Sequence, residues 1–203
     1  NSFVISSIGD ARRLNPIIAN DSASGTINDQ VFSGLVKYDK DIKLIGDLAE
    51  RWTVSRDGRT ITFHLRKGVQ WHDGAPFTAE DCLFTYQRLM DPKVATPYGS
   101  SYMDVARAEV VDKHTFRVTY KEPFSPALES WSMGVIPRHL LEGKDINTDG
   151  FNRNPVGTGP YKLKEWTAGQ KIVLEANDRY FEGRPNIDQY LYRPFQCVIE
   201  SLV

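Results

Sequence analysis

Apolar and polar residues alternate in the first half of the chain, which is the pattern of a strand with one buried face. Ile61, Phe63 and Leu65 are separated by single polar residues, and the polar turn 55–58, which ends in a glycine, precedes them. A turn of this composition beside such a run is typical of a β-hairpin. The pattern therefore predicts a β-hairpin over 52–65.

Apolar residues at three- and four-residue spacing follow this hairpin and indicate a helix. Thr78 lies three residues before Asp81, which is the spacing of a helix cap, and the pair Asp91-Pro92 ends the pattern. A residue before proline disfavours helical geometry. We predict a helix over 79–90.

A second helical pattern lies nearer the start of the chain. Ile27, Val31 and Leu35 are four residues apart, and the small polar stretch 20–24 precedes them. The spacing predicts a helix within 26–36 that is entered from a loop over 20–24. The first N–H groups of such a helix would be free to meet a carboxylate or a peptide carbonyl.

Shorter patterns predict the remaining elements. Apolar positions 3–5 indicate a buried strand, and the polar stretch 144–154 indicates an exposed loop. The other predicted elements are a strand pair within 38–48, a hairpin from 108–111 and 115–120, a short helix ending near 131, another at 137–141, and a strand pair from 161–166 and 171–176. Gly157 and Gly159 make a tight passage into this last pair.

Composition excludes several classes of partner. The chain has 203 residues, a net charge of −1 and 40% hydrophobic residues, with acids and bases interspersed. It is long enough to bury a core, and its charge favours neither nucleic acid nor an anionic membrane surface. No run approaches the roughly 20 apolar residues of a transmembrane helix, so we expect no stable membrane insertion. Cys82 and Cys197 are too few for a disulfide framework.

The residue patterns do not indicate catalysis. The four histidines lack the spacing of a metal-binding motif, and the sequence contains no G-x-S-x-G elbow. Asp73, Glu80 and Asp81 are explained by a turn and by the start of the predicted helix. His72 is expected to satisfy a turn. We therefore predict no catalytic residues, no metal site and no cofactor, which argues against a hydrolase or other enzyme on an α/β scaffold.

Two long motifs resemble a known family. The first runs LAERW at 48–52, a DG turn at 57–58 and TFHLRKGVQWHDGAPFTAED at 62–81, and the second runs NPVGTGPYKLKEW at 154–166 with KIVLEAN and DRYFEGRPNID over 171–188. Both resemble the bacterial extracellular solute-binding proteins of family 5, the oligopeptide-, dipeptide- and nickel-binding receptors of ABC importers. The resemblance fades over 193–203.

The resemblance implies a fold. It predicts an α/β chain with mixed sheets, of the periplasmic-binding-protein-like type II architecture. Segments 1–45 and 150–203 would form the central sheet of the first lobe, and 46–149 an α+β subdomain inserted into it. Family members are more than twice this length, so the second lobe is expected to be absent from this chain.

The same resemblance implies a function. The chain would help to capture a small solute, most simply a short peptide, and deliver it to the membrane subunits of an ABC permease. This places it in the periplasm or outside the cell, held at the membrane by the transporter or a lipid anchor, and as a monomer in full-length form. The alternatives are a receptor for nickel chelates, sugars or opines, and a stand-alone interaction or sensor domain derived from this lobe.

The ligand-binding candidates come from two regions. The family's first loop lines the ligand cleft, although such a loop can also serve only as a helix cap. Aromatic rings and a thioether near later loops can form apolar walls for varied side chains. The predicted ligand-binding residues are Asn20, Asp21, Ser22, Ala23 and Ser24 in the loop, with Tyr98, Tyr102, Trp131 and Met133. Trp71 is expected in the core.

Overall fold

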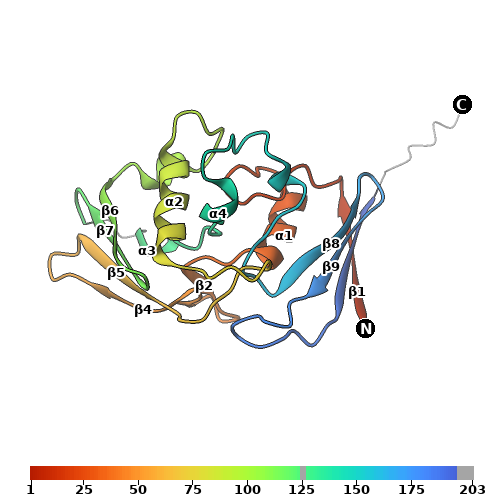
Figure 1. Cartoon of the computed structure of the whole chain (residues 1–203), viewed down its shortest axis with the longest axis horizontal. Helices are drawn as coiled ribbons and strands as arrows, with labels where there is room; N and C mark the ends of the chain where they lie inside the picture. Colours follow the sequence, from red (N-terminus) through yellow and green to blue (C-terminus); the bar gives the residue numbers. More distant parts are fainter. Residues whose placement is uncertain (124–126, 196–203) are drawn as a thin grey trace, which may run out of the picture.

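Two four-stranded sheets lie at opposite ends of the molecule, with the longer helices between them (Figure 1). The computed structural model describes residues 1–123 and 127–195, apart from the side chain of Ile8. The strands are β1 Ser2–Ile8, β2 Val36–Tyr38, β3 Leu44–Gly46, β4 Ala49–Val54, β5 Thr60–Leu65, β6 Val105–Asp112, β7 Thr115–Tyr120, β8 Tyr161–Thr167, β9 Lys171–Ala176 and β10 Gln189–Phe195. The helices are α1 Ser22–Val31, α2 Ala79–Met90, α3 Ala127–Ser130 and α4 Arg138–Leu141, with 3-10 turns η1 Gly99–Tyr102 and η2 Gly150–Asn152.

The first sheet has the strand order β1-β10-β9-β8, and β1 pairs with β10 in parallel. The predicted strand at 3–5 is therefore confirmed, but the prediction that it is buried is wrong. Phe3 and Val4 are 50% and 53% exposed. Since β1 lies at the edge of the sheet, it has a neighbouring strand on one side only among the described residues.

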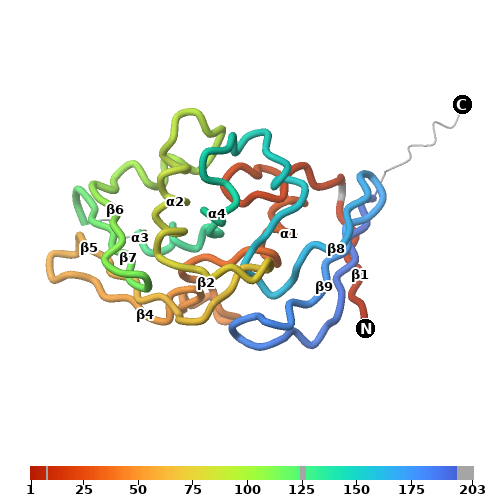
Figure 2. The backbone as a smooth tube through the Cα atoms, viewed as in Figure 1, coloured from red at the N-terminus to blue at the C-terminus, as the bar shows by residue number. Residues whose placement is uncertain are grey.

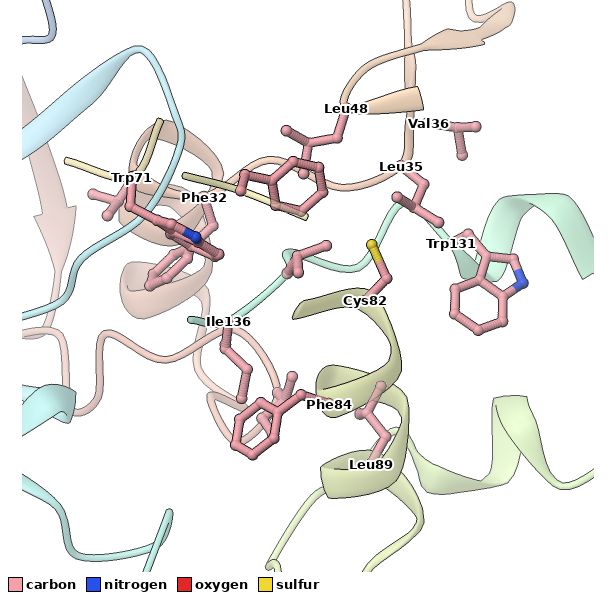
Figure 3. Close-up of a cluster of buried hydrophobic side chains, with 14 of the residues drawn as sticks. Phe32, Leu35, Val36, Leu48, Trp71, Cys82, Phe84, Leu89, Trp131 and Ile136 are labelled. Atoms are coloured by element: carbon pink, nitrogen blue, oxygen red, sulfur yellow. The ribbon is translucent and has the colours of Figure 1, made fainter. Parts of the chain in front are cut away.

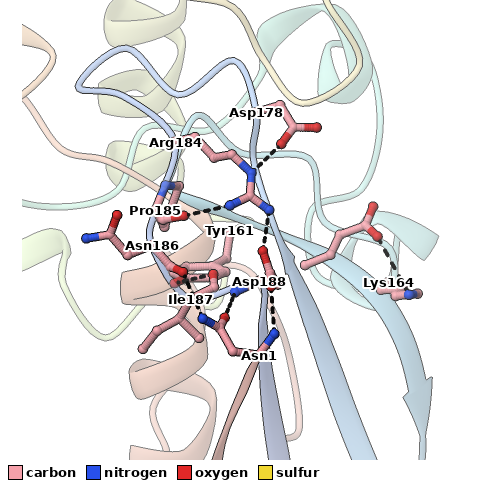
Figure 4. Close-up of polar contacts among 10 residues, drawn as sticks. Asn1, Tyr161, Lys164, Asp178, Arg184, Pro185, Asn186, Ile187 and Asp188 are labelled. Carbon is pink, nitrogen blue, oxygen red and sulfur yellow. Dashed lines mark hydrogen bonds and ion pairs between the residues drawn. The ribbon is translucent and has the colours of Figure 1, made fainter.

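Polar contacts hold the segment before β10 against the start of β1 (Figure 4). Arg184 pairs with Asp178 at 2.7 Å and with Asp188 at 2.6 Å, and the backbone N–H of Asp188 donates to Asn1 Oδ1 at 2.9 Å. Tyr161 of β8 donates its hydroxyl to the carbonyl of Ile187 at 3.1 Å. These contacts help to set the register of β1 against β10.

The second sheet has the order β4-β5-β7-β6 and consists of two hairpins, as predicted. Ile61 and Phe63 of β5 are buried and lie opposite Val118 and Phe116 of β7. The alternation in the sequence therefore marks the face that packs on the core.

The predicted helix at 79–90 is confirmed as α2, and its start is fixed by a buried carboxylate. Thr78 and Asp81 form a capping box in which the N–H of Thr78 donates to Asp81 Oδ2 at 3.0 Å. Asp81 also accepts the N–H of Arg138 at 3.0 Å and the indole N–H of Trp71 at 3.4 Å. The Asp81 carboxylate thus connects the start of α2 to the start of α4 and to Trp71, which precedes the turn at 72–74.

The core collects side chains from distant parts of the sequence (Figure 3). Phe32 and Leu35 follow α1, Cys82 comes from α2, and Trp131 follows α3, and all are buried. Trp71 is 1% exposed, which confirms its predicted place in the core.

The prediction that 144–154 is an exposed loop is wrong in part. Ile146, Phe151 and Asn152 are buried. Asn152 accepts a hydrogen bond from Asn15 Nδ2 at 3.0 Å and donates one to the carbonyl of Ile146 at 2.9 Å, while the ring of Phe151 lies 6.1 Å from that of Phe32. The segment closes over the residues that precede α1.

The two larger sheets draw on different parts of the chain. The β1-β10-β9-β8 sheet comes from the two ends of the described chain, and the β4-β5-β7-β6 sheet from its middle. The β2–β3 pair lies between them in sequence and spans position 45. The boundaries at 45/46 and 149/150 remain predictions.

Candidate ligand-binding cavity

Helix α1 begins at Ser22, about one turn earlier than predicted. Asp21 is its N-cap and accepts the N–H of Ser24 through Oδ1 at 2.8 Å. The hydroxyl oxygen of Ser24 in turn accepts the N–H groups of Arg12 and Arg13 at 2.9 and 3.2 Å. The last three residues of the predicted loop are therefore helical, and the amide of Ser24 is already bonded within the protein.

The helix also ends earlier than predicted. Phe32 is extended, and Leu35 donates its N–H to the carbonyl of Trp131 at 2.8 Å. Leu35, the last residue of the predicted helical spacing, therefore lies beyond the end of the helix and in the core.

A cavity of about 300 Å³ opens beside α1. Three segments form its walls, namely α1 with the residues before it, η1 with Tyr98, and the stretch 129–134. The lining contains four of the predicted ligand-binding residues, Asp21, Tyr98, Tyr102 and Met133, together with Pro16, Ala19, Gly25, Asn28, Asp29, Ser101, Glu129, Ser130, Ser132 and Gly134. Their role in binding a ligand remains a prediction.

Two tyrosine hydroxyls connect these walls. Tyr98 donates its hydroxyl to the carbonyl of Ala19 at 2.6 Å, and Tyr102 donates to the carbonyl of Ser130 at 2.5 Å. The first bond joins η1 to the segment before α1, and the second joins it to the segment after α3. The cavity is therefore held open by contacts within the protein.

The other five predicted residues do not line this cavity. Asn20 and Ser22 are exposed, Ala23 and Ser24 are buried, and Trp131 is 6% exposed. The Trp131 ring lies 5.3 Å from that of Tyr102, and its indole N–H donates to the Tyr120 hydroxyl at 2.9 Å. Ser24 and Trp131 thus support the walls from behind, and a direct ligand contact for any of the five stays a prediction.

Two polar side chains at the cavity have unused hydrogen-bonding atoms. Asn28 is 4% exposed, and neither its amide oxygen nor its amide nitrogen has a hydrogen-bond partner among the described residues. The same holds for the buried Oδ2 of Asp21. Buried polar atoms without partners cost stability, so a bound molecule that gave them hydrogen bonds would offset that cost.

Sequence reasoning missed Asn28, Asp29 and Glu129. A signal for the first two exists, because Asp21, Gly25, Asn28 and Asp29 are spaced as one face of a helix. This common face can be recognised only if the helix is taken to begin at Ser22 and not at Thr26. Partial burial at the cavity wall raises the pKa of Asp29.

A second cavity of about 460 Å³ adjoins the first and shares Asp29 and Ser132 with it. Lys37 lies on its wall, 3.4 Å from Asp47 Oδ1, and also pairs with Glu182. The hydroxyl of Tyr180 donates to Glu182 at 3.0 Å. Burial raises the pKa of Asp47 to about 6, although Lys37 opposes the shift.

We predict that replacing Asp47 with asparagine changes the pH dependence of stability. Because the folded-state pKa lies above the ordinary 3.8, this carboxyl favours folding at low pH, and that contribution is lost as the pH rises through about 6. The variant lacks this loss, so between pH 4 and 7.5 its free energy of unfolding should rise relative to the unsubstituted protein by up to about 3 kcal/mol. Urea denaturation at several pH values measures the difference. Asp41→Asn, on the exposed turn between β2 and β3, is the control, and parallel curves for Asp47→Asn would show that the carboxyl is not destabilised by burial.

His72 was expected to satisfy a turn, but its ring bonds a distant segment of the chain. The N–H of Gly157 donates to His72 Nδ1 at 3.2 Å, and His72 Nε2 lies 3.0 Å from the carbonyl oxygen of Gly159. Burial lowers the pKa of His72 to about 4. The neutral ring thus links the first family motif to the second.

The described residues contain neither a metal-binding cluster nor a helix suited to cross a membrane. Over 1–123 and 127–195, no group of three or more His, Cys, Asp or Glu side chains is arranged to hold a metal ion. Within the same ranges, none of the helices combines the length and apolar character that a membrane crossing requires.

The fold is that of solute-binding proteins. The structure of oligopeptide-binding AppA from Bacillus subtilis in complex with a nonapeptide matches with a TM-score of 0.90 and 33% identity, over 96% of this chain and 40% of AppA. NikZ from Campylobacter jejuni in complex with Ni(L-His) matches with a TM-score of 0.89 and 31% identity, over 96% of this chain and 39% of NikZ.

Sequence comparison then identifies the family. The family model described as bacterial extracellular solute-binding proteins, family 5 Middle, matches residues 43–197, and the chain belongs to this family. AppA of Bacillus subtilis (strain 168) is 35% identical over 199 residues, and the glutathione-binding protein GsiB of Salmonella choleraesuis is 37% identical over 187 residues. These matches cover 94% and 89% of this chain and 36% of each relative. The predicted family and fold class are confirmed, and the chain spans little more than a third of these relatives.

Proposed function

We propose that this chain forms one ligand-binding lobe of an extracytoplasmic receptor that captures short peptides for an ABC permease. The observation that carries the proposal is the cavity beside α1, where Asn28 and Asp21 present unpartnered buried atoms between fixed walls. AppA is an oligopeptide-binding protein, which supports a peptide as the ligand. The family's extracellular character supports a site of action in the periplasm or outside the cell.

The chemistry of the cavity suits a peptide main chain. A side-chain amide donates and accepts hydrogen bonds, so Asn28 can satisfy a peptide N–H and a peptide C=O together. The half-buried Tyr98 and Met133 supply apolar surface that tolerates different side chains. None of the four histidines lies in the lining of this cavity. These groups hold a ligand without transforming it, and we propose binding without catalysis.

The proposed mechanism is closure of two lobes over the ligand. A ligand favours the closed state only through contacts that it makes better in that state. One lobe alone offers only its own share of those contacts. The closed form is what the membrane subunits of the permease would receive, and the full-length receptor acts as a monomer held near the membrane by the transporter or a lipid anchor.

Calorimetric titration with a mixture of di- to pentapeptides tests the function. We expect the complete natural protein to bind with micromolar or tighter dissociation constants, and the 203-residue chain to fold but bind weakly or not measurably. Micromolar binding by the 203-residue chain alone would contradict the need for a second lobe. Failure of the complete protein to bind any peptide would contradict peptide capture.

Asn28→Ala in the complete protein tests the site. Loss of two hydrogen bonds to a bound peptide should weaken binding about tenfold or more. Asn186→Ala is the control, because Asn186 is exposed in the loop before β10. Equal affinities for the two variants would place the ligand elsewhere.

A further inference from the structure

We propose that the cavity beside α1 selects peptides that carry a positively charged side chain, whose head group is an ammonium or a guanidinium. The inference rests on the proposed function and narrows its substrate class. It follows from the charges on the cavity wall and from the buried atoms that lack partners.

Three carboxylates line the cavity, Asp21, Asp29 and Glu129, while its described lining contains neither lysine nor arginine. The adjoining cavity adds one base, Lys37, which already pairs with Asp47 and Glu182. Among the residues that line the two cavities, no unpaired base therefore balances the negative charge of the first. A cavity lined by charges of one sign favours ligands of the opposite sign.

The placement of Asp21 strengthens this argument. One of its oxygens is bonded to the amide of Ser24, and the other is buried and has no partner among the described residues. The acid thus occupies the helix N-terminus, where a ligand carboxylate would otherwise be attracted. An anionic group would meet this carboxylate, and a cationic group would give its free oxygen a hydrogen bond.

Asn28 supplies a second, independent feature. It lies two helical turns along the same face of α1, is 4% exposed, and has an amide oxygen without a partner among the residues described. An ammonium carries three donors and a guanidinium five. Such a group can therefore bond the Asn28 oxygen and a neighbouring carboxylate at once.

Asp29 and Glu129 extend the negative wall toward the second cavity. Asp29 lines both cavities, and Glu129 raises the pKa of Tyr38, which lines the second. Burial of part of its side chain raises the pKa of Asp29, while the residue as a whole stays exposed, so a ligand can reach it. A nearby cation favours the charged carboxylate.

The test uses the complete natural protein and a set of pentapeptides. Penta-alanine is compared with five peptides that carry one lysine at each position in turn, and with five that carry one glutamate. We expect at least one lysine peptide to bind about tenfold tighter than penta-alanine and than its glutamate counterpart. This preference should shrink as salt is raised from low to high concentration.

Charge-neutralising variants connect the preference to the cavity. In the triple variant Asp21→Asn, Asp29→Asn and Glu129→Gln, the ratio of lysine-peptide to glutamate-peptide affinity should fall to within about twofold; asparagine at position 21 keeps a helix-capping side chain. Glu122→Gln is the matched control, since Glu122 is exposed and pairs with Arg59, just before β5, away from the cavity lining. It should leave the ratio unchanged.

The outcomes separate the two proposals. Binding of all peptides without a preference for lysine would overturn the charge selection and leave peptide capture standing. A lysine preference that survives the triple variant would also overturn it, because the selecting charges would lie elsewhere. Failure to bind any of the eleven peptides would contradict the proposed function, and the charge selection with it.

Discussion

Replacing Trp131 with alanine lowers the free energy of unfolding by about 4 kcal/mol, which is the usual cost of removing a buried large aromatic side chain. The Trp131 ring is 6% exposed and lies within 5.9 Å, centroid to centroid, of the rings of Phe63, Tyr102 and Phe116. It joins the β5–β7 face to the wall of the cavity. Urea denaturation followed by circular dichroism measures the loss.

The control for this variant is Phe195→Ala, because Phe195 is 67% exposed. Its effect should lie within about 0.5 kcal/mol. A Trp131→Ala protein of unchanged stability that fails to bind peptide would show that the ring contacts the ligand and is not needed for the core. Loss of stability together with weaker binding fits support of the wall from behind.

Replacing Gly157 with alanine should destabilise the fold by about 4 kcal/mol or more, because the added methyl group has no room. A Cβ at this position would overlap the carbonyl oxygen of Val31, a backbone atom that cannot swing aside. The next glycine, Gly159, donates its N–H to that same oxygen at 2.9 Å. The backbone passes directly against the end of α1 on its way to β8 (Figure 2).

Gly150→Ala is the matched control, since nothing lies within 4 Å of a Cβ added there. Thermal and urea denaturation of the two variants should differ clearly, with Gly150→Ala close to the unsubstituted protein. Equal stability of the two variants would mean that the backbone at Gly157 does not pass against the end of α1 as described. It would also weaken the proposed position of the cavity, whose wall includes α1.

The elements that could be predicted from the sequence are those fixed by neighbours along the chain. The β4–β5 and β6–β7 hairpins follow from alternation, and α2 from its capping box and the proline after it. The start of α1 was misplaced because its capping residue, Asp21, is followed by small polar residues that also suit a loop. Tertiary contacts of Ser24 with Arg12 and Arg13 hold these residues in the helix.

Burial that depends on distant partners could not be predicted in this way. The stretch 144–154 contains mostly polar residues, and its buried members are satisfied by Asn15 and Phe32, far back in the sequence. Likewise, Asn28 becomes a candidate only when η1 and the 129–134 stretch close the cavity around it. Of the site, the sequence and its family resemblance indicated Asp21, Tyr98, Tyr102 and Met133 as candidates.

The hydroxyl bonds of Tyr98 and Tyr102 to main-chain carbonyls have a thermodynamic consequence for recognition. Because folding already orders the loops that surround the guest, capture of that guest does not incur this loss of conformational entropy again. Differences in affinity among ligands should then arise mainly from how well each one fits the preformed site. Removing either tyrosine hydroxyl would loosen that site in the unliganded protein.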